Sequence, residues 1–300
     1  MAEQGTVNPW VVGSSPTSPA MKIQHISSYG DIDISRIHQH FLEDGVVVLR
    51  GFDMSFDQQR ELMMGLGDLM LWYPNHKYPH ASFAYIENHE HTLEMRSSPQ
   101  LDERLGIGAD DVLVEWHMEH IGFPNPAVGA SWNMRTFTCS NEYGKTLFVD
   151  AVKLFAMLGK EDADFLVKCL FQEDVGLSSK IPPIWICPIR KHLPTGKMMV
   201  YISPVKTIGF GEKLRYAQTH KPTEDERARF NEICTNLATM IKTNIEIRTE
   251  HKWQQHDVVI ADLSRQYHAV TGGFRSSERN FEGIWAHGLN GDKFGVAATR

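Results

Sequence analysis

Cysteine is scarce in this chain of 300 residues, and the few that occur lie far apart in the sequence. No Cys-x-x-Cys pair is present, so the sequence predicts neither a zinc ribbon nor a disulfide framework. Isolated thiols fit a reducing compartment, and we therefore expect a cytoplasmic protein. The cysteines are Cys139, Cys169, Cys187 and Cys234.

Basic clusters and long apolar runs are also missing. The formal net charge is −7 and no block of Lys and Arg occurs, which argues against a nucleic acid as partner. No stretch reaches the roughly 18 consecutive apolar residues of a membrane-spanning helix, so no membrane partner is expected. Residues 1–20 lack a basic start followed by an apolar run and are rich in Ser, Pro and Gly. That composition is typical of a flexible arm rather than a signal peptide.

Residues 21–300 show no break in composition and are expected to form one domain. Its expected binding partner is a small molecule. The oligomeric state is not visible in the sequence, and a homo-oligomer is compatible with it.

Fifteen histidines are present, so a metal site has to be argued from pattern rather than from any single histidine. The stretch 112–120, Val-Leu-Val-Glu-Trp-His-Met-Glu-His, begins with apolar, β-branched residues typical of a strand. Alternation along a strand puts His117 and Glu119 on one face and His120 on the other. Two histidines and one carboxylate on one side of a metal suit non-haem Fe(II) and O2 chemistry.

A distant histidine must supply the third ligand. His268, six residues after the buried segment 257–262, is the candidate. The simpler interpretation of an isolated His-x-Glu is a pair of ordinary strand residues, as in a non-enzymatic β-sandwich binding module. Zinc at the same ligands, with water in the open position, would make the protein a hydrolase. A ligand pair of His117 and His120 is a further alternative that strand alternation disfavours.

Periodicity and turn residues predict many short strands and few helices. We expect one mostly β domain with flanking α-helices, an antiparallel sandwich or barrel. A jelly-roll core would bring the strand at residue 117 and a turn at residue 268 to one mouth. The expected strands are 46–51, 82–87, 112–120, 129–138, 146–150, 184–188, 198–203, 245–248, 257–262 and 280–285. The expected helices are 33–44, 55–64, 151–158, 162–170 and 223–242, and the expected turns are 141–145 and 192–196.

The segment 71–111 is long, polar and rich in aromatic residues. Such segments are often binding loops or lids, although an ordinary surface excursion is an equal alternative. If it is a binding loop, the candidate substrate-binding residues are Trp72, Tyr73, Asn75, His76 and His80.

Several motifs in order resemble the taurine dioxygenase-like branch of the Fe(II)/2-oxoglutarate-dependent oxygenases. The resemblance covers residues from about 30 to 290. It rests on Trp116-His-Met-Glu119, Gly144-Lys-Thr146-Leu-Phe, and Trp253 followed by Asp257-Val-Val-Ile-Ala-Asp262, His268 and Arg279, with weaker echoes at Gly67-Asp-Leu and Tyr78-Pro-His80.

The resemblance implies a double-stranded β-helix (jelly roll, cupin-like) with Fe(II) at His117, Glu119 and His268. It also implies that Thr146 and Arg279 hold the far carboxylate of 2-oxoglutarate. A guanidinium is a fixed, charged fork that suits a carboxylate. The implied reaction consumes O2 and 2-oxoglutarate, releases succinate and CO2, and oxidises an unactivated C–H bond of a substrate.

Departures from the family pattern bear on the substrate. Glu119 stands where many family members have Asp. Some related amino-acid hydroxylases also carry Glu at this position. Gly283 occupies the slot where the taurine enzymes carry an arginine for the sulfonate, so taurine is not expected. Arg275 competes with Arg279 as the cosubstrate anchor, and spacing favours Arg279. We expect a small polar, amino-acid-like or natural-product-intermediate substrate, in keeping with secondary metabolism.

A fainter likeness, through segments 67–72 and 259–262, points to the isonitrile-pathway dioxygenases. A member of that subgroup would carry out oxidative decarboxylation or desaturation. The sequence does not choose between hydroxylation, desaturation, ring formation and bond cleavage.

Overall fold

The computed structural model describes most of the chain. The described residues are 21–70, 83–85, 92–96, 112–119, 121, 126–172, 184–203, 214–216 and 221–287, with only the backbone considered at 83–85 and 92–96. The arm expected at residues 1–20 and most of the segment 71–111 lie outside these ranges.

Strands make up most of the regular structure. They are β1 (Lys22–His25), β2 (Val46–Arg50), β3 (Phe83–Tyr85), β4 (Thr92–Arg96), β5 (Val112–His117), β6 (Gly129–Phe137), β7 (Thr146–Asp150), β8 (Cys169–Phe171), β9 (Ile189–Lys191), β10 (Met198–Val200), β11 (Leu214–Tyr216), β12 (Arg248–His251), β13 (Val258–Asp262), β14 (Gln266–Thr271) and β15 (Arg279–Ala286). The helices are α1 (Ile34–Asp44), α2 (Phe56–Leu66), α3 (Ala151–Ala156), α4 (Lys160–Leu166) and α6 (Glu224–Thr243), with 3-10 turns η1 (Tyr29–Asp31) and η4 (Ser276–Glu278).

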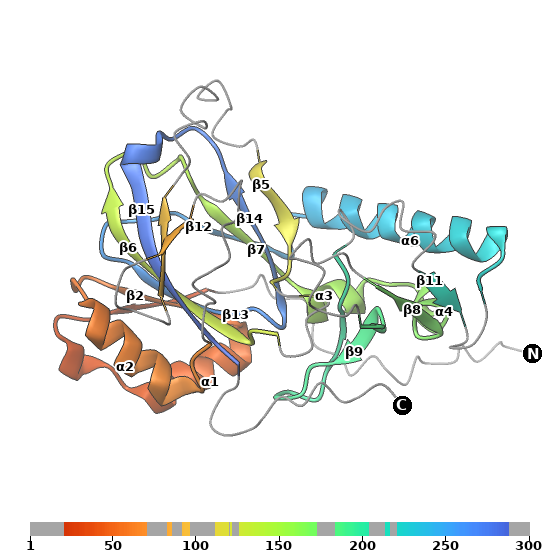
Figure 1. Ribbon diagram of the computed structural model, residues 1–300, viewed down its shortest axis with the longest axis horizontal. Coiled ribbons are helices and arrows are strands. Elements are labelled where there is room, and N and C mark those ends of the chain that lie inside the picture. Colours follow the sequence, from red (N-terminus) through yellow and green to blue (C-terminus); the bar gives the residue numbers. More distant parts are fainter. Residues whose placement is uncertain are drawn as a thin grey trace, which may run out of the picture.

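Two sheets form the body of the molecule (Figure 1). A seven-stranded sheet has the order β1-β2-β13-β6-β15-β4-β3, and a four-stranded sheet has the order β12-β7-β14-β5. Neighbouring strands in both sheets are antiparallel except for β1 and β2. Strands far apart in sequence therefore lie side by side, as in a double-stranded β-helix, and the predicted jelly-roll fold class is confirmed.

Apolar layers fill the space inside and outside the two sheets. Trp132 of β6 and Phe148 of β7 belong to one cluster, which fills the interior between the sheets. Helices α1 and α2 cover the outer face of the larger sheet through a second cluster. Helices α3 and α6 pack against the outer face of the smaller sheet through a third. The candidate site residues described below project into the interior layer.

The composition of β2 follows from its position between two layers. Val46 and Val48 face the interior, whereas Val47 and Leu49 face α1 and α2. A strand covered on both faces has no solvent side, which explains why an unbroken apolar run, rather than an alternating one, forms this strand.

Side-chain caps begin the longest helices where the sequence predicts them. The Asp33 carboxylate accepts from the backbone N–H of Arg36 at the start of α1, and Gly45 ends that helix with φ of 75°. Ser55 caps α2, and the Thr223 hydroxyl accepts from the N–H of Glu226 in a capping box at α6. None of the helices in the described ranges has the length and apolar character of a membrane span.

Several boundary predictions are wrong. Residues 184–188 form a single bridge, at Ile186, and the strand begins at Ile189. Helix α4 occupies Lys160–Leu166 rather than 162–170, because residues 169–171 pair with β11. The strand expected at 245–248 is β12, shifted to Arg248–His251. Strands β1, β4, β8 and β11 were not predicted, since short strands are defined by their partners more than by their own sequence.

The most consequential correction concerns His268. The sequence places it in a turn, whereas the structure places it within β14.

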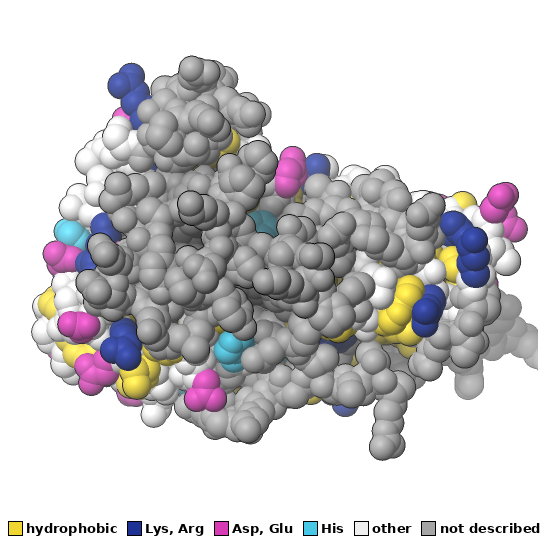
Figure 2. Space-filling view, in the orientation of Figure 1, with side chains coloured by type: hydrophobic (Ala, Val, Ile, Leu, Met, Phe, Trp, Pro, Cys, Tyr) yellow, Lys and Arg dark blue, Asp and Glu magenta, His cyan; other side chains and the backbone are white. Residues whose placement is uncertain are grey.

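On the face drawn in Figure 2, acidic and basic side chains of the described residues lie interspersed.

Candidate active site

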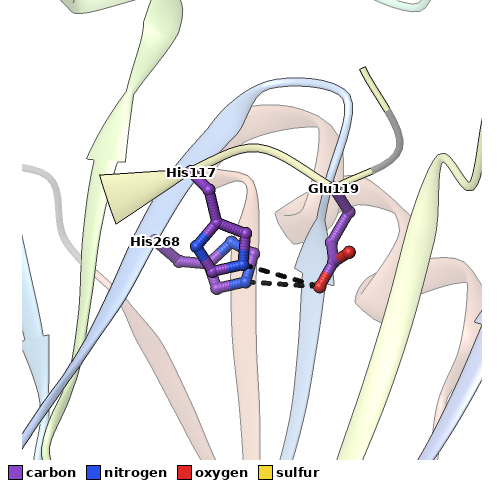
Figure 3. Close-up of side chains that lie close together, drawn as sticks. All are labelled: His117, Glu119 and His268. Carbon is purple, nitrogen blue, oxygen red and sulfur yellow. Dashed lines mark ion pairs between the residues drawn. The ribbon is translucent and has the colours of Figure 1, made fainter. Parts of the chain in front are cut away.

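Three potential metal ligands converge from β5 and β14 (Figure 3). His117 is the last residue of β5, and His268 lies directly opposite it in the antiparallel register with β14. Glu119 follows two residues after His117, beyond the end of the strand. Its side chain still turns towards both imidazoles, as the predicted alternation requires.

The distances within this group suit a single ion. The Nε2 atoms of His117 and His268 each lie 3.7 Å from Oε1 of Glu119. One ligand atom from each residue lies within 4.8 Å of the other two. Neighbouring ligands around an ion at about 2.1 Å are roughly 3 Å apart, so small side-chain rotations bring the three atoms to bonding distance. The donor set of two imidazoles and one carboxylate fits Fe(II).

Both imidazoles turn a ring nitrogen towards Glu119. Nδ1 of His117 lies 2.7 Å from the carbonyl oxygen of Glu115. A carbonyl can only accept, so Nδ1 carries a proton, and Nε2, on the side of Glu119, is the nitrogen that can bind a metal. Burial, reinforced by the neighbouring His117, lowers the pKa of His268 to about 4 despite the opposing effect of Glu119. His268 is therefore uncharged near neutral pH.

A buried arginine forms the second half of the site. Arg279 begins β15 in the interior of the molecule, with 6% of its surface exposed. The rings of Trp253, Phe274 and Phe281 have their centroids 5.6, 5.4 and 4.9 Å from its guanidinium carbon. Burial lowers the pKa of Arg279 to about 10, so the side chain is still a cation at neutral pH.

No carboxylate in the described part of the chain pairs with Arg279. Its Nη2 lies 3.5 Å from the hydroxyl oxygen of Thr146, and its buried Nε has no hydrogen-bond partner among the described residues. A buried charge without a counter-charge is costly. An anion beside Arg279 and Thr146 would offset this cost.

Strand register puts His268 of β14 and Thr146 of β7 on the same face of the smaller sheet. On β7, Thr146 and Phe148 alternate with Leu147, and Phe148 is the cross-strand partner of His268. The rings of Phe148 and His268 lie 6.4 Å apart. The side chains of His268 and Thr146 thus face the same interior layer.

Gly144 has a role that the sequence did not reveal. Its φ is +58°, and a Cβ at this position would lie 3.0 Å from Cδ of Arg279 and 2.9 Å from Cδ1 of Phe274. Glycine is the residue that tolerates both constraints, so Gly144 lets the arginine lie close to the turn before β7. The Gly144-Lys-Thr146 motif was the sequence signal for this site, although the motif alone gave no reason for the glycine.

The competing arginine lies elsewhere. Arg275 is exposed at the start of η4, and its backbone N–H donates to the Glu278 carboxylate. Arg279 is the one of the two that reaches Thr146.

Gly283 faces an aromatic side chain rather than open space. A Cβ there would lie 2.4 Å from two ring atoms of Trp285 and 3.4 Å from Trp132. The indole of Trp285 thus occupies the volume over this strand position.

Other predicted site residues lie outside the described residues. These are Trp72, Tyr73, Asn75, His76, His80 and the alternative ligand His120.

Comparison with known proteins identifies the family. The sequence matches the family described as "Taurine catabolism dioxygenase TauD, TfdA family" over residues 12–285. A search among curated protein sequences gave no significant match.

Solved structures share the fold at low sequence identity. A putative alpha-ketoglutarate-dependent taurine dioxygenase from Burkholderia xenovorans has a TM-score of 0.65 at 17% identity, covering 90% of this chain and 87% of that one. PvcB from Pseudomonas aeruginosa has a TM-score of 0.63 at 12% identity, covering 96% and 100%. AAD-2, solved with Mn(II) and N-oxalylglycine, has a TM-score of 0.58 at 15% identity, covering 89% and 94%.

The family match extends over nearly the whole chain, and these folds agree with it. Neither the zinc hydrolase nor the non-enzymatic binding module fits this membership. The chain belongs to the TauD, TfdA family and is an Fe(II)- and 2-oxoglutarate-dependent dioxygenase.

Proposed function

We propose that His117, Glu119 and His268 hold the Fe(II), and that Arg279 and Thr146 hold the far carboxylate of 2-oxoglutarate. The observation that carries this assignment is the buried Arg279, which lacks a counter-charge among the described residues and shares an interior layer with the three ligands. A dicarboxylate held between the ligand group and Arg279 would neutralise the arginine.

The bound metal supplies O2 activation and the oxidative decarboxylation of 2-oxoglutarate. The protein's own residues orient the cosubstrate and exclude water from the site. Glu119 would place one negative charge beside the ion, and His117 and His268, as ligands through a ring lone pair, would add none, so the site would keep a net positive charge for the near carboxylate. Arg279 and Thr146 fix the opposite end, and the aromatic rings around Arg279 exclude water from it.

An anaerobic titration tests this proposal. Fe(II) and 2-oxoglutarate together should produce the visible charge-transfer absorption of the chelate, whereas either alone should not. Glu119→Ala should abolish the band, and Arg279→Ala should shift its appearance to higher 2-oxoglutarate concentrations. A band that appears at unchanged concentrations in Arg279→Ala would refute the cosubstrate assignment.

We infer that the substrate is a small polar, amino-acid-like or natural-product-intermediate molecule, and not taurine. The contact between Gly283 and Trp285 supports the exclusion of taurine. Trp285 leaves no room for a long basic side chain at position 283, so a sulfonate would have to be held elsewhere. A screen for succinate release across candidate substrates, read by product mass, tests the inference.

Oxidative decarboxylation or desaturation is the alternative outcome of the same chemistry. A protein with a similar fold, PvcB, is described as an Fe, alpha-ketoglutarate dependent oxygenase from an isonitrile synthetic pathway. This similarity is the support for the alternative. A product that gains one oxygen atom indicates hydroxylation, whereas loss of two hydrogens or of CO2 indicates the alternative.

We propose that the segment 72–91, together with the segment after His268, covers the open side of the iron. Its aromatic and polar composition is the support for this role. A Tyr73→Ala, His76→Ala double variant should weaken substrate binding and leave 2-oxoglutarate affinity nearly intact. Wild-type kinetics on the true substrate would contradict this assignment.

We also propose that residues 21–300 act as one catalytic domain in the cytoplasm. Elements from β1 to β15 share the larger sheet, which supports one domain. The four cysteines are free, which supports a reducing compartment.

A further inference from the structure

The hydroxyl of Thr146 is surrounded by groups that can only donate hydrogen bonds. The indole Nε1–H of Trp253 donates to Oγ1 of Thr146 at 2.9 Å. Nη2 of Arg279 lies 3.5 Å from the same oxygen. A hydroxyl offers two lone pairs and one proton, whereas an indole N–H and a guanidinium have no acceptor. With donors at its lone pairs, Thr146 has its proton left to donate to a further group.

Trp253 is held firmly enough to impose this direction. It is buried at 1% exposure in the turn between β12 and β13. Its ring stacks on Phe281 at 6.2 Å with planes 11° apart, and His251 meets it edge-on at 4.4 Å. The indole therefore has little freedom to turn its N–H away from Thr146.

A buried charge cluster fixes the turn that carries Trp253. The two carboxylate oxygens of Asp257 each accept from Arg50 at 2.7 Å. Asp257 also accepts from the backbone N–H of Gln254, directly after Trp253, at 2.9 Å. His251, on the other side of Trp253, has its Nε2 3.2 Å from Asp257. Asp257 thus holds the residue after the tryptophan by a hydrogen bond and lies close to His251, two residues before it.

We propose that Trp253 is a positioning residue that turns Thr146 into an obligate hydrogen-bond donor. Thr146 and Arg279 then present only donors to the pocket. Such a pair accepts a carboxylate, which is acceptor-only, and rejects a carboxamide, whose NH2 group would face a donor. The inference rests on the proposed function, because the selected carboxylate is the far end of 2-oxoglutarate.

Calorimetry with the Mn(II)-loaded protein and N-oxalylglycine tests the idea without turnover. Trp253→Phe keeps an aromatic ring but loses the N–H. It should weaken N-oxalylglycine binding roughly threefold to tenfold, part of the contribution of one hydrogen bond to a charged group. A matched analogue carries a carboxamide in place of the far carboxylate of N-oxalylglycine. Its binding to Trp253→Phe should weaken less or improve, so the preference for carboxylate over carboxamide should fall. Mn(II) affinity should not change.

A double-mutant cycle separates positioning from packing. In a Thr146→Val background, Trp253→Phe should change N-oxalylglycine affinity less than about twofold, because the hydroxyl that it orients is gone. Thr146→Ser keeps the hydroxyl and should restore the sensitivity to Trp253→Phe. Equal losses in the wild-type and Thr146→Val backgrounds would overturn the proposal, as would unchanged selectivity in Trp253→Phe.

Two results keep this inference distinct from the proposed function. If Arg279→Ala leaves N-oxalylglycine binding intact, the cosubstrate assignment fails and takes the inference with it. If Arg279→Ala weakens binding but Trp253→Phe does not, the inference alone fails.

Should Trp253→Phe not fold, the indole 15N–1H resonance of Trp253 in the intact chain provides the test. It should shift on Thr146→Val and again on binding N-oxalylglycine. An indole signal that responds to neither would overturn the proposal.

Discussion

His117 and His268 are direct cross-strand partners on β5 and β14, with ring centroids 4.2 Å apart. About half of the chain separates the two residues in sequence, and strand register makes them neighbours. The pairing of β14 with β5 begins at this pair of histidines and continues to Thr271 with register shifts.

Removing any of the three ligands should abolish tight metal binding. His117→Ala, Glu119→Ala and His268→Ala each leave two ligands, which do not complete the facial set. Each variant should stay folded, because the surrounding core is apolar and complete without the metal. Anaerobic calorimetry with Fe(II) and circular dichroism would measure the two effects.

His40→Ala is the matched control for this prediction. His40, Glu43 and Asp44 form the other His and carboxylate cluster in the described residues, on the surface of α1. Its removal should leave iron affinity unchanged. Tight Fe(II) binding and normal turnover in Glu119→Ala would show that the ligand assignment is wrong.

Arg279→Ala should raise the 2-oxoglutarate requirement by roughly one to three powers of ten, since loss of a charged partner in a desolvated pair costs about 2–5 kcal/mol. Thr146→Val should have a smaller effect, because one hydroxyl bond to a charged group contributes roughly 1.5–3 kcal/mol. Arg275→Ala is the control and should leave the requirement unchanged, as its side chain is exposed. A larger effect at Arg275 would reverse the assignment.

Taurine should not support succinate release above the rate without substrate.

Gly283→Ala should also impair the enzyme on its true substrate, because the new methyl group would lie 2.4 Å from the Trp285 ring and force it to move. The free energy of unfolding should fall by about 1–3 kcal/mol, as is usual for overpacking. Efficient turnover of taurine by the wild-type protein would contradict the first expectation, and wild-type stability of Gly283→Ala the second.

Asp257→Asn should destabilise the fold at neutral pH by about 3 kcal/mol, because it leaves the partly buried Arg50 without its counter-charge. Asp53→Asn is the control. Asp53 is an exposed carboxylate 3.3 Å from Arg135, and such surface pairs contribute about 0–1 kcal/mol. Chemical denaturation would compare the two variants, and equal losses would contradict the role given to the buried pair.

Acid should remove the stabilisation that Asp257 provides. Burial raises the pKa of Asp257, but hydrogen bonds from Arg50 and His251 outweigh burial and hold the pKa below its usual range. The folded pKa is then lower than the unfolded one. The stabilisation is complete above the unfolded value of about 4 and is lost as pH falls through the folded value. Unfolding free energies measured against pH should show a shallower acid loss in Asp257→Asn than in the wild type.

The sequence by itself determined the features that local chemistry encodes. The caps of α1, α2 and α6, the doubly buried β2 and the same-side placement of His117 and Glu119 follow from residues within a few positions of one another. The fold class and the enzyme family followed from the order of such motifs along the chain. The roles of His117, Glu119, His268, Thr146 and Arg279 stay predictions.

Only the tertiary structure decided the rest, because it depends on pairing between distant strands. The register of β14 against β5 and β7 placed His268 within a strand, opposite His117 and Phe148. The burial of Arg279 and the exposure of Arg275 were not visible from spacing. The contact of Trp253 with Thr146 joins the turn after β12 to β7. Side chains from separate strands meet only after the sheets have formed, since long-range packing, not local propensity, sets which strands are neighbours.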